Sequence, residues 1–319
     1  MKIIFFGSSD FSVPFLEYLY NAEHNIAAVV TNTDKITGRG KKTIPNPVKV
    51  FASGKGIKVI EVVKLDDVFY EKIKEINFDC FVIVSFGHII PKKIIEFAGD
   101  NVINVHPSAL PLFRGPSPII TTLLEGCSHS GISIMRINEN LDEGDIYAQS
   151  LFRIGDYENK EMLEEKIITI GAPLLNSVLE LIDKGLIETY PQTGIPSYTR
   201  LFEKKDFIID WSSGSRDIIN KVRAFSQEPG AQTSFRDMKI KILSAGVADD
   251  YRNHMLSCKS DICPSEGEII AADKTNGVIV FCGRNEAVKL LELKPEGKNK
   301  ISVHDFLNGY RVKTGEYFY

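Results

Sequence analysis

The chain has 319 residues, 43% of them hydrophobic and 25% charged, which is typical of a globular protein of about two domains. Its net charge of −4 disfavours broad electrostatic binding to nucleic acid, so any RNA contact must use local basic patches. No apolar run approaches the roughly 18 residues of a membrane span, and the N-terminus resembles a strand and not a signal peptide, so we expect a cytoplasmic protein with no membrane partner.

The first part of the chain alternates strand and helix patterns. Predicted strands are Lys2–Phe6, Asn25–Val30, Ile57–Val62, Cys80–Val84, Val102–Val105, Ile132–Ile137 and Ile146–Phe152, and predicted helices are Phe11–Tyr20, Asp67–Ile76 and Lys160–Leu186. This alternation predicts an α/β catalytic domain over residues 1–188, built on a doubly wound, mostly parallel, Rossmann-like sheet.

The composition changes after Glu188. Residues 189–207 include two prolines and show no clean period, which predicts an interdomain linker. Residues 208–319 begin with a predicted helix and continue with short strands separated by turns, the clearest being the Asn-Gly hairpin turn at Asn276. The predicted elements are the helix Ser213–Ala224 and the strands Gln232–Phe235, Met238–Leu243, Gly267–Ala272, Gly277–Cys282 and Val288–Leu293. This pattern predicts a small OB-like β-barrel domain.

The five cysteines are scattered along the chain. Cys80 and Cys282 lie in apolar strand patterns, which predicts that both are buried in the core. Cys258 and Cys263 have no further His or Cys at metal-ligand spacing. The sequence therefore predicts no metal site, and it assigns Cys258 and Cys263 no role.

Two polar stretches carry the chemistry. In Asn104–Gly115, NVHPSALPLFRG, the side chains of Asn104 and His106 point to one face of a strand, and the prolines that follow end the strand. The acidic loop Leu141–Asp145, LDEGD, offers a carboxylate that could return to the same place. An amide, an imidazole and a carboxylate are the components of an acyl-transfer site.

Three other interpretations fit the sequence less well: a core histidine, a hydrolase triad and a dinucleotide-binding turn. A lone histidine such as His106 is more often a core residue, but the amide before it and the proline-bounded loop after it favour catalysis. Ser108, His106 and Asp142 could form a hydrolase triad, yet Ser108 and His106 are two residues apart across a proline, and no G-x-S-x-G elbow is present. Gly7 lacks the further glycines of a dinucleotide site.

The pattern N-x-H-P-S-x-L-P-x-x-R-G followed by L-D-x-G-D resembles the signature of the 10-formyltetrahydrofolate-dependent formyltransferases. The resemblance implies that Asn104 donates to a developing oxyanion and that protonated His106 stabilises it and relays a proton. It selects Asp142 as the carboxylate that stabilises the imidazolium and orders a water. Glu139 and Glu143 are then solvated loop charges. It also implies 10-formyltetrahydrofolate as the co-substrate, with no metal.

The same resemblance implies where the folate binds. One wall would be the loop after the catalytic histidine, and the other would be a stretch similar to the pterin-side wall of the family. The implied residues are Ser108, Ala109, Leu110, Pro111, Phe86, Gly87 and Ile89. Gly87 would let a ring approach the backbone, and Arg114 would have a structural role.

A basic, glycine-containing loop follows the second strand. It carries Lys35, Arg39, Lys41 and Lys42, but it lacks the spacing of a phosphate-binding P-loop. A solvated loop is the simplest interpretation. The resemblance implies instead that DKITGRGKKTIPNPVK enters the acceptor stem of initiator methionyl-tRNA, which a monomeric enzyme would formylate for translation initiation. The alternatives are formylation of a small amine, such as glycinamide ribonucleotide or an amino sugar, and a catalytically idle RNA-binding protein.

Overall fold

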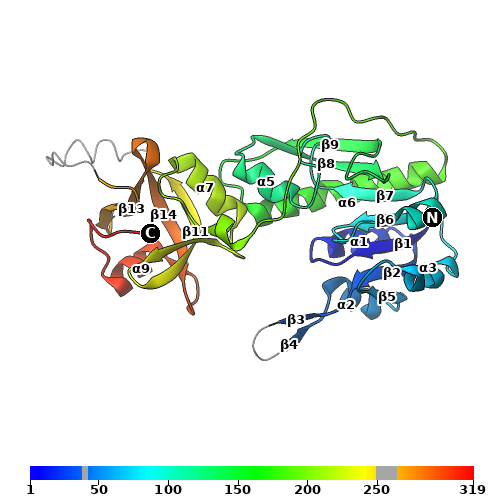
Figure 1. The fold of residues 1–319 in the computed structure, drawn as a ribbon, viewed down its shortest axis with the longest axis horizontal. Helices are drawn as coiled ribbons and strands as arrows, with labels where there is room; N and C mark the ends of the chain where they lie inside the picture. Colours follow the sequence, from blue (N-terminus) through cyan, green and yellow to red (C-terminus); the bar gives the residue numbers. More distant parts are fainter. Residues whose placement is uncertain (38–41, 249–263) are drawn as a thin grey trace. The chain divides into compact units, whose positions relative to one another are not determined.

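The computed structural model describes residues 1–37, 42–248 and 264–319, which form two compact units (Figure 1). The first unit comprises Met1–Pro118, His129–Arg153 and Glu164–Arg200, and the second comprises Ile119–Ser128, Ile154–Leu163 and Leu201–Tyr319. Within the described ranges, no helix combines the length and apolar character needed to span a bilayer.

A seven-stranded sheet forms the centre of the first unit. Its strands are β1 (Lys2–Gly7), β2 (Asn25–Asn32), β5 (Val59–Val62), β6 (Cys80–Val84), β7 (Val102–His106), β8 (His129–Arg136) and β9 (Ile146–Arg153). They are ordered β5-β2-β1-β6-β7-β8-β9. The first five in this order are parallel, and β8 and β9 continue the sheet in antiparallel pairing. This arrangement confirms the predicted doubly wound, mostly parallel sheet.

The strand order reverses beside β1: the chain runs from β1 through β2 to β5 on one side, and then returns to β6 on the other side of β1. Open α/β sheets hold ligands at such a switch point, outside the carboxyl ends of the strands. Here the loops after β1 and β6 are joined by hydrogen bonds from Ser9 Oγ to Ser85 Oγ (2.9 Å) and from Ser12 Oγ to Val84 O (2.6 Å). β7 ends beside this position at His106.

Alternating residues of β1 supply both layers of the core. Ile4 and Phe6 belong to a buried cluster on one face, and Ile3 and Phe5 are equally buried on the other. The helices before residue 200 are α1 (Ser12–Asn21), α2 (Pro47–Gly54), α3 (Asp67–Lys74), α4 (Lys92–Ala98), α5 (Pro118–Leu124) and α6 (Lys160–Asp183); all of α5 after its first residue, and the start of α6, belong to the second unit. α2, α4 and α5, each of seven or eight residues, were not predicted.

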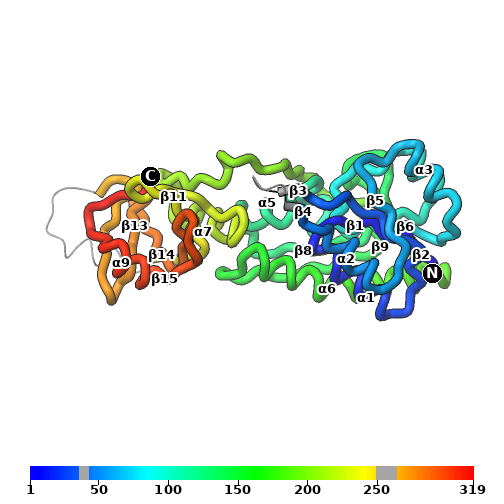
Figure 2. Tube along the Cα trace, turned by 90° about the horizontal axis from the view of Figure 1, so that it is seen from below, coloured from blue at the N-terminus to red at the C-terminus, as the bar shows by residue number. Residues whose placement is uncertain are grey.

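The second unit is built on an antiparallel sheet. Its elements are η1 (Lys204–Phe207), α7 (Ser215–Ala224), β10 (Ala231–Phe235), β11 (Met238–Val247), β12 (Ile269–Asp273), β13 (Gly277–Cys282), η2 (Gly283–Asn285), β14 (Glu286–Pro295), β15 (Ile301–Ser302) and α9 (Val303–Tyr310). The strand order is β10-β11-β14-β13-β12, and β15 pairs with β14. α7 packs on β11 and β14, while α9 packs on β13 and β14 (Figure 2).

The end of the chain closes this sheet on itself. Phe318 bridges Phe235 of β10, and Tyr317 bridges Glu268 immediately before β12, so one segment joins the two edges. This closure agrees with the predicted barrel. The predicted hairpin at Gly277 is also present, with Gly277 at a positive φ of 77°. Cys80 and Cys282 are buried as predicted, whereas Cys258 and Cys263 lie outside the described residues.

Candidate active site

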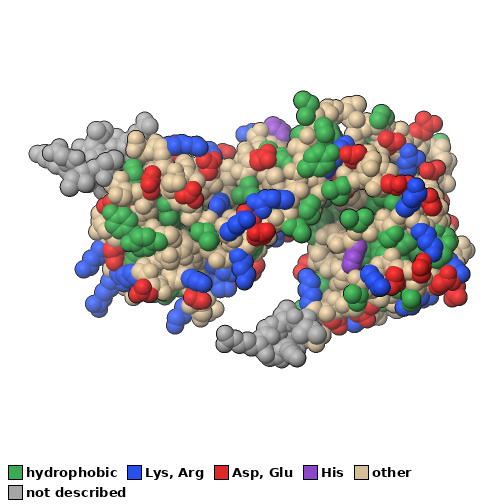
Figure 3. Space-filling view, viewed as in Figure 1, with side chains coloured by type: hydrophobic (Ala, Val, Ile, Leu, Met, Phe, Trp, Pro, Cys, Tyr) green, Lys and Arg blue, Asp and Glu red, His purple; other side chains and the backbone are tan. Residues whose placement is uncertain are grey.

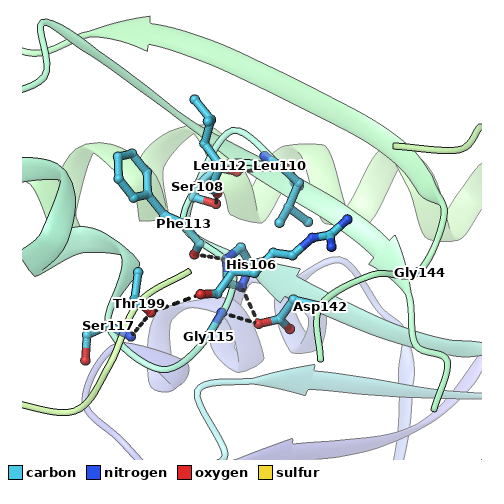
Figure 4. Close-up of polar contacts among 12 residues, drawn as sticks. His106, Ser108, Leu110, Leu112, Phe113, Gly115, Ser117, Asp142, Gly144 and Thr199 are labelled. Carbon is cyan, nitrogen blue, oxygen red and sulfur yellow. Dashed lines mark hydrogen bonds and ion pairs between the residues drawn. The ribbon is translucent and has the colours of Figure 1, made fainter. Parts of the chain in front are cut away.

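β7 places His106 at the carboxyl end of the parallel strands, where its ring is only 4% exposed. The ring nitrogen Nε2 lies 3.0 Å from the carbonyl oxygen of Phe113. A carbonyl can only accept, so Nε2 carries a hydrogen in this arrangement. The other nitrogen, Nδ1, faces Asp142 Oδ2 at 3.6 Å (Figure 4). The strand end and the acidic loop therefore meet.

A hydrogen bond and a close packing contact hold the acidic loop in an unfavourable backbone conformation. Asp142 has a φ of 51°, a left-handed conformation that costs free energy for a residue with a side chain. Its Oδ2 accepts a 2.7 Å hydrogen bond from the backbone N–H of Gly115. Gly144 packs so closely on β8 that a Cβ there would lie 1.7 Å from the backbone oxygen of Arg136. The loop can approach β8 this closely only because residue 144 has no side chain.

The surroundings of His106 determine its charge. Burial lowers the pKa of His106 and outweighs the opposing effect of the Asp142 carboxylate, while Arg114 lowers it further. These surroundings favour the neutral imidazole in the free protein. The protonated His106 that the resemblance implies is therefore expected to form during the reaction, because burial opposes the charge in the free protein more than Asp142 supports it.

Arg114 links the acidic loop to two polar side chains, Gln192 and Tyr198, from the segment after α6. Arg114, only 8% exposed, donates from Nη1 to Glu143 Oε1 (2.7 Å) and to Tyr198 OH (3.1 Å), and from Nε and Nη2 to Gln192 Oε1. Glu143 is therefore a partner of Arg114 and not the solvated charge that we expected. Gln192 and Tyr198 were not predicted, because they lie in a stretch without periodicity.

The remaining catalytic candidates sit near His106. Asn104 is half-buried on β7, two residues earlier, so strand alternation directs it to the same face. Ser108 is fully buried, and its hydroxyl donates to Leu112 O at 2.6 Å. Because that hydroxyl is directed to a backbone carbonyl of its own loop, the structure gives no support to a Ser-His-Asp triad.

The predicted folate-binding residues divide into exposed and buried groups. Gly87 has a φ of 82°, and a Cβ built there would meet no atom within 4 Å, while Ile89 is 85% exposed. By contrast, the Phe86 ring packs against Phe6 in the core. The Leu110 side chain is 5% exposed and belongs to a buried cluster with Met135 and Ile146. Ala109 and Pro111 are half-buried.

The basic loop belongs to a hairpin of β3 (Lys35–Thr37) and β4 (Lys42–Ile44), which projects from the end of β2 (Figure 1). Lys35 is exposed, Lys42 begins β4, and Arg39 and Lys41 lie outside the described residues. Asp34 anchors the base of the hairpin, because its carboxylate accepts from Asn46 N and from Lys49 Nζ, each at 3.0 Å. The loop therefore has a fixed base beside the carboxyl end of β2.

Comparisons with known proteins identify the family of the chain. The formyl transferase family matches residues 1–179, and the formyl transferase C-terminal domain matches residues 202–311. A methionyl-tRNA formyltransferase of Dictyoglomus thermophilum is 38% identical over 321 residues, covering 100% of both chains. One of Carboxydothermus hydrogenoformans is 36% identical, covering 100% of this chain and 99% of that one.

Solved structures share the fold. The sugar 3N-formyl transferase WlaRD, crystallised in the presence of 5-N-formyl-THF, superposes with a TM-score of 0.64 at 23% identity, covering 94% of this chain and 99% of that one. HypX from Aquifex aeolicus in complex with tetrahydrofolic acid gives 0.65 at 16% identity, covering 99% and 48%. With the two family matches and the relatives aligned along its whole length, the chain belongs to the formyl transferase family.

Proposed function

We propose that this chain transfers a formyl group from 10-formyltetrahydrofolate to the α-amino group of methionine esterified to initiator tRNA. The observation that carries the proposal is the approach of His106 Nδ1 to Asp142 Oδ2 at the carboxyl end of β7. The full-length relatives named methionyl-tRNA formyltransferase support the choice of substrate.

In the proposed mechanism, the neutral His106 accepts a proton. Its Nε2–H is tied to Phe113 O, so Nδ1 is the atom that can gain a proton. The proton comes from the attacking amine, and the resulting imidazolium is stabilised by Asp142. Asn104, on the same face of β7, donates its amide hydrogen to the developing oxyanion. His106 then returns the proton to the leaving nitrogen.

The folate donor supplies an activated formyl group. Gly87 fits a flat ring, because its backbone faces open space and lacks a side chain. Ile89 adds an exposed apolar surface at the same loop. Phe86 and Leu110 would contribute only through their backbones, because both side chains are packed in the interior. The half-buried Ala109 and Pro111 would line the other wall, and the fully buried Ser108 would support it from behind.

Binding of the tRNA is assigned to the basic loop and to the C-terminal part of the chain. Residues 1–188 would form the catalytic domain, 189–207 the linker, and 208–319 the tRNA-binding domain. Lys35, Arg39, Lys41 and Lys42 would contact acceptor-stem phosphates. Basic and acidic side chains are interspersed on the face shown in Figure 3, so local contacts, and not a broad positive field, would hold the RNA.

One assay separates the proposal from its rivals. The purified chain is mixed with 10-formyltetrahydrofolate and, in parallel, with methionyl initiator tRNA, glycinamide ribonucleotide and a nucleotide-linked amino sugar. We expect formylation of the tRNA alone, and its loss in His106→Ala. Formylation of only a small amine would support a small-molecule formyltransferase. RNA binding without any formylation would support a catalytically idle RNA-binding protein.

A further inference from the structure

The side-chain amide of Gln192 connects two parts of the site. Its Nε2 donates to the backbone oxygens of Asp142 and Gly144, both at 2.8 Å. Its Oε1 accepts from Nη2 of Arg114 at 2.8 Å and from Nε at 3.1 Å. An amide offers two donor hydrogens and two acceptor lone pairs, so all four positions are used.

We infer that Gln192 is a positioning residue for the formyl-transfer reaction, which fixes the acidic loop so that Asp142 stays beside His106. This inference rests on the proposed function. The two carbonyls that Gln192 holds lie on either side of Glu143, so one side chain fixes the peptide units flanking the loop's turn. Gly115 N–H holds the carboxylate itself, and Gln192 holds the backbone that carries it.

The need for such a clamp follows from the conformation of the loop. Asp142 has a φ of 51°, which is unfavourable without external support. Among neutral side chains, an amide is the group that can donate two hydrogens to the two carbonyls and also accept from the Arg114 guanidinium, whereas a hydroxyl has only one hydrogen to donate. A glutamate at position 192 could still accept from Arg114, but it would direct a carboxylate at two carbonyl oxygens. A leucine would leave all four groups unpaired.

The steady-state test compares Gln192→Leu and Gln192→Glu with the wild type and with Thr193→Val, a change at an exposed neighbouring residue. Small displacements of a catalytic group are costly, so we expect kcat to fall roughly 10- to 100-fold in both Gln192 variants while both KM values stay within about twofold. Thr193→Val should match the wild type. An unchanged kcat in folded Gln192 variants would overturn the inference.

A second readout does not depend on activity. The titration of His106 is followed by NMR of the free protein labelled at histidine, with His106→Ala assigning the resonance. The charged groups acting on His106 are Asp142, which raises its pKa, and Arg114, which lowers it. Withdrawal of Asp142 in Gln192→Leu should lower the titration midpoint.

The same substitution made in Asp142→Asn supplies the control, because no carboxylate is then left to withdraw. We expect no shift of the midpoint in that background. An equal shift in both backgrounds, or none in either, would overturn the inference. Thermal melting checks that each variant folds. If Gln192→Leu does not fold, the same measurements are made on Gln192→Glu. If neither variant folds, the inference is overturned in favour of a folding role for Gln192. If the wild type does not formylate tRNA, the proposed function is refuted. The positioning of Asp142 by Gln192 is then judged from the NMR result alone.

Discussion

Asp142→Asn isolates the contribution of one charge. The asparagine keeps an oxygen for the Gly115 N–H and leaves the backbone contacts of Gln192 in place, so the loop should remain where it is. What is lost is the attraction between the carboxylate and a protonated His106 at 3.6 Å. At an effective dielectric constant of about 20, that attraction is about 4 to 5 kcal/mol. Partial exposure of Asp142 reduces it, because its side chain retains 16% of its accessible surface.

This energy bears on the transition state of the proposed mechanism, in which the imidazole of His106 gains its charge during the reaction. Since about 1.4 kcal/mol corresponds to tenfold in rate, we expect kcat to fall by about 10²- to 10³-fold with little change in either KM. Single-turnover formylation of charged tRNA measures the effect. Glu139→Gln is the matched control, because Glu139 is an exposed partner of Lys92. A loss of less than about tenfold in a folded Asp142→Asn protein would refute a charge-stabilising role.

Three further predictions concern pH, packing and RNA contacts. Burial lowers the pKa of His106 in the folded protein below its ordinary 6.5, so between the lowered pKa and 6.5 the unfolded chain binds a proton that the folded chain does not. In that window the free energy of unfolding should increase as pH rises, and decrease as pH falls, by up to about 1.4 kcal/mol per pH unit. His106→Gln should flatten this slope in urea titrations. Gly144→Ala should displace the acidic loop and lower kcat more than about tenfold, because a Cβ there would lie 1.7 Å from a backbone oxygen, whereas Gly54→Ala, in open space, should leave kcat unchanged. Arg39→Ala or Lys41→Ala should raise the KM for charged tRNA and weaken its dependence on salt without changing the folate KM; an unchanged tRNA KM would make the loop a bystander.

Local patterns were sufficient to predict the sheet and half of the site. Buried strands have short β-branched runs, and a period of two places Asn104 and His106 on one face whatever surrounds them. The same reasoning could not supply the charge of His106, because a spacing does not report how deeply a ring is buried. It also could not predict the left-handed backbone at Asp142, which a residue with a side chain adopts only when tertiary contacts support it.

Gln192 shows why composition also failed to mark the limits of the site. The change in character after Glu188 predicted a linker, yet the compact first unit continues to Arg200. Within that stretch, the Ser197 carbonyl accepts from the backbone N–H of Arg114, and the Thr199 N–H donates to the Arg114 carbonyl. The segment therefore pairs with the loop after β7 as an added strand would. A single glutamine between prolines has no period and no motif; its importance comes from the four groups that folding brings to it. The backbone that carries the proposed catalytic carboxylate is therefore held by a residue about 50 positions away in sequence, and an irregular stretch can be as fixed as a strand when its hydrogen bonds are long-range.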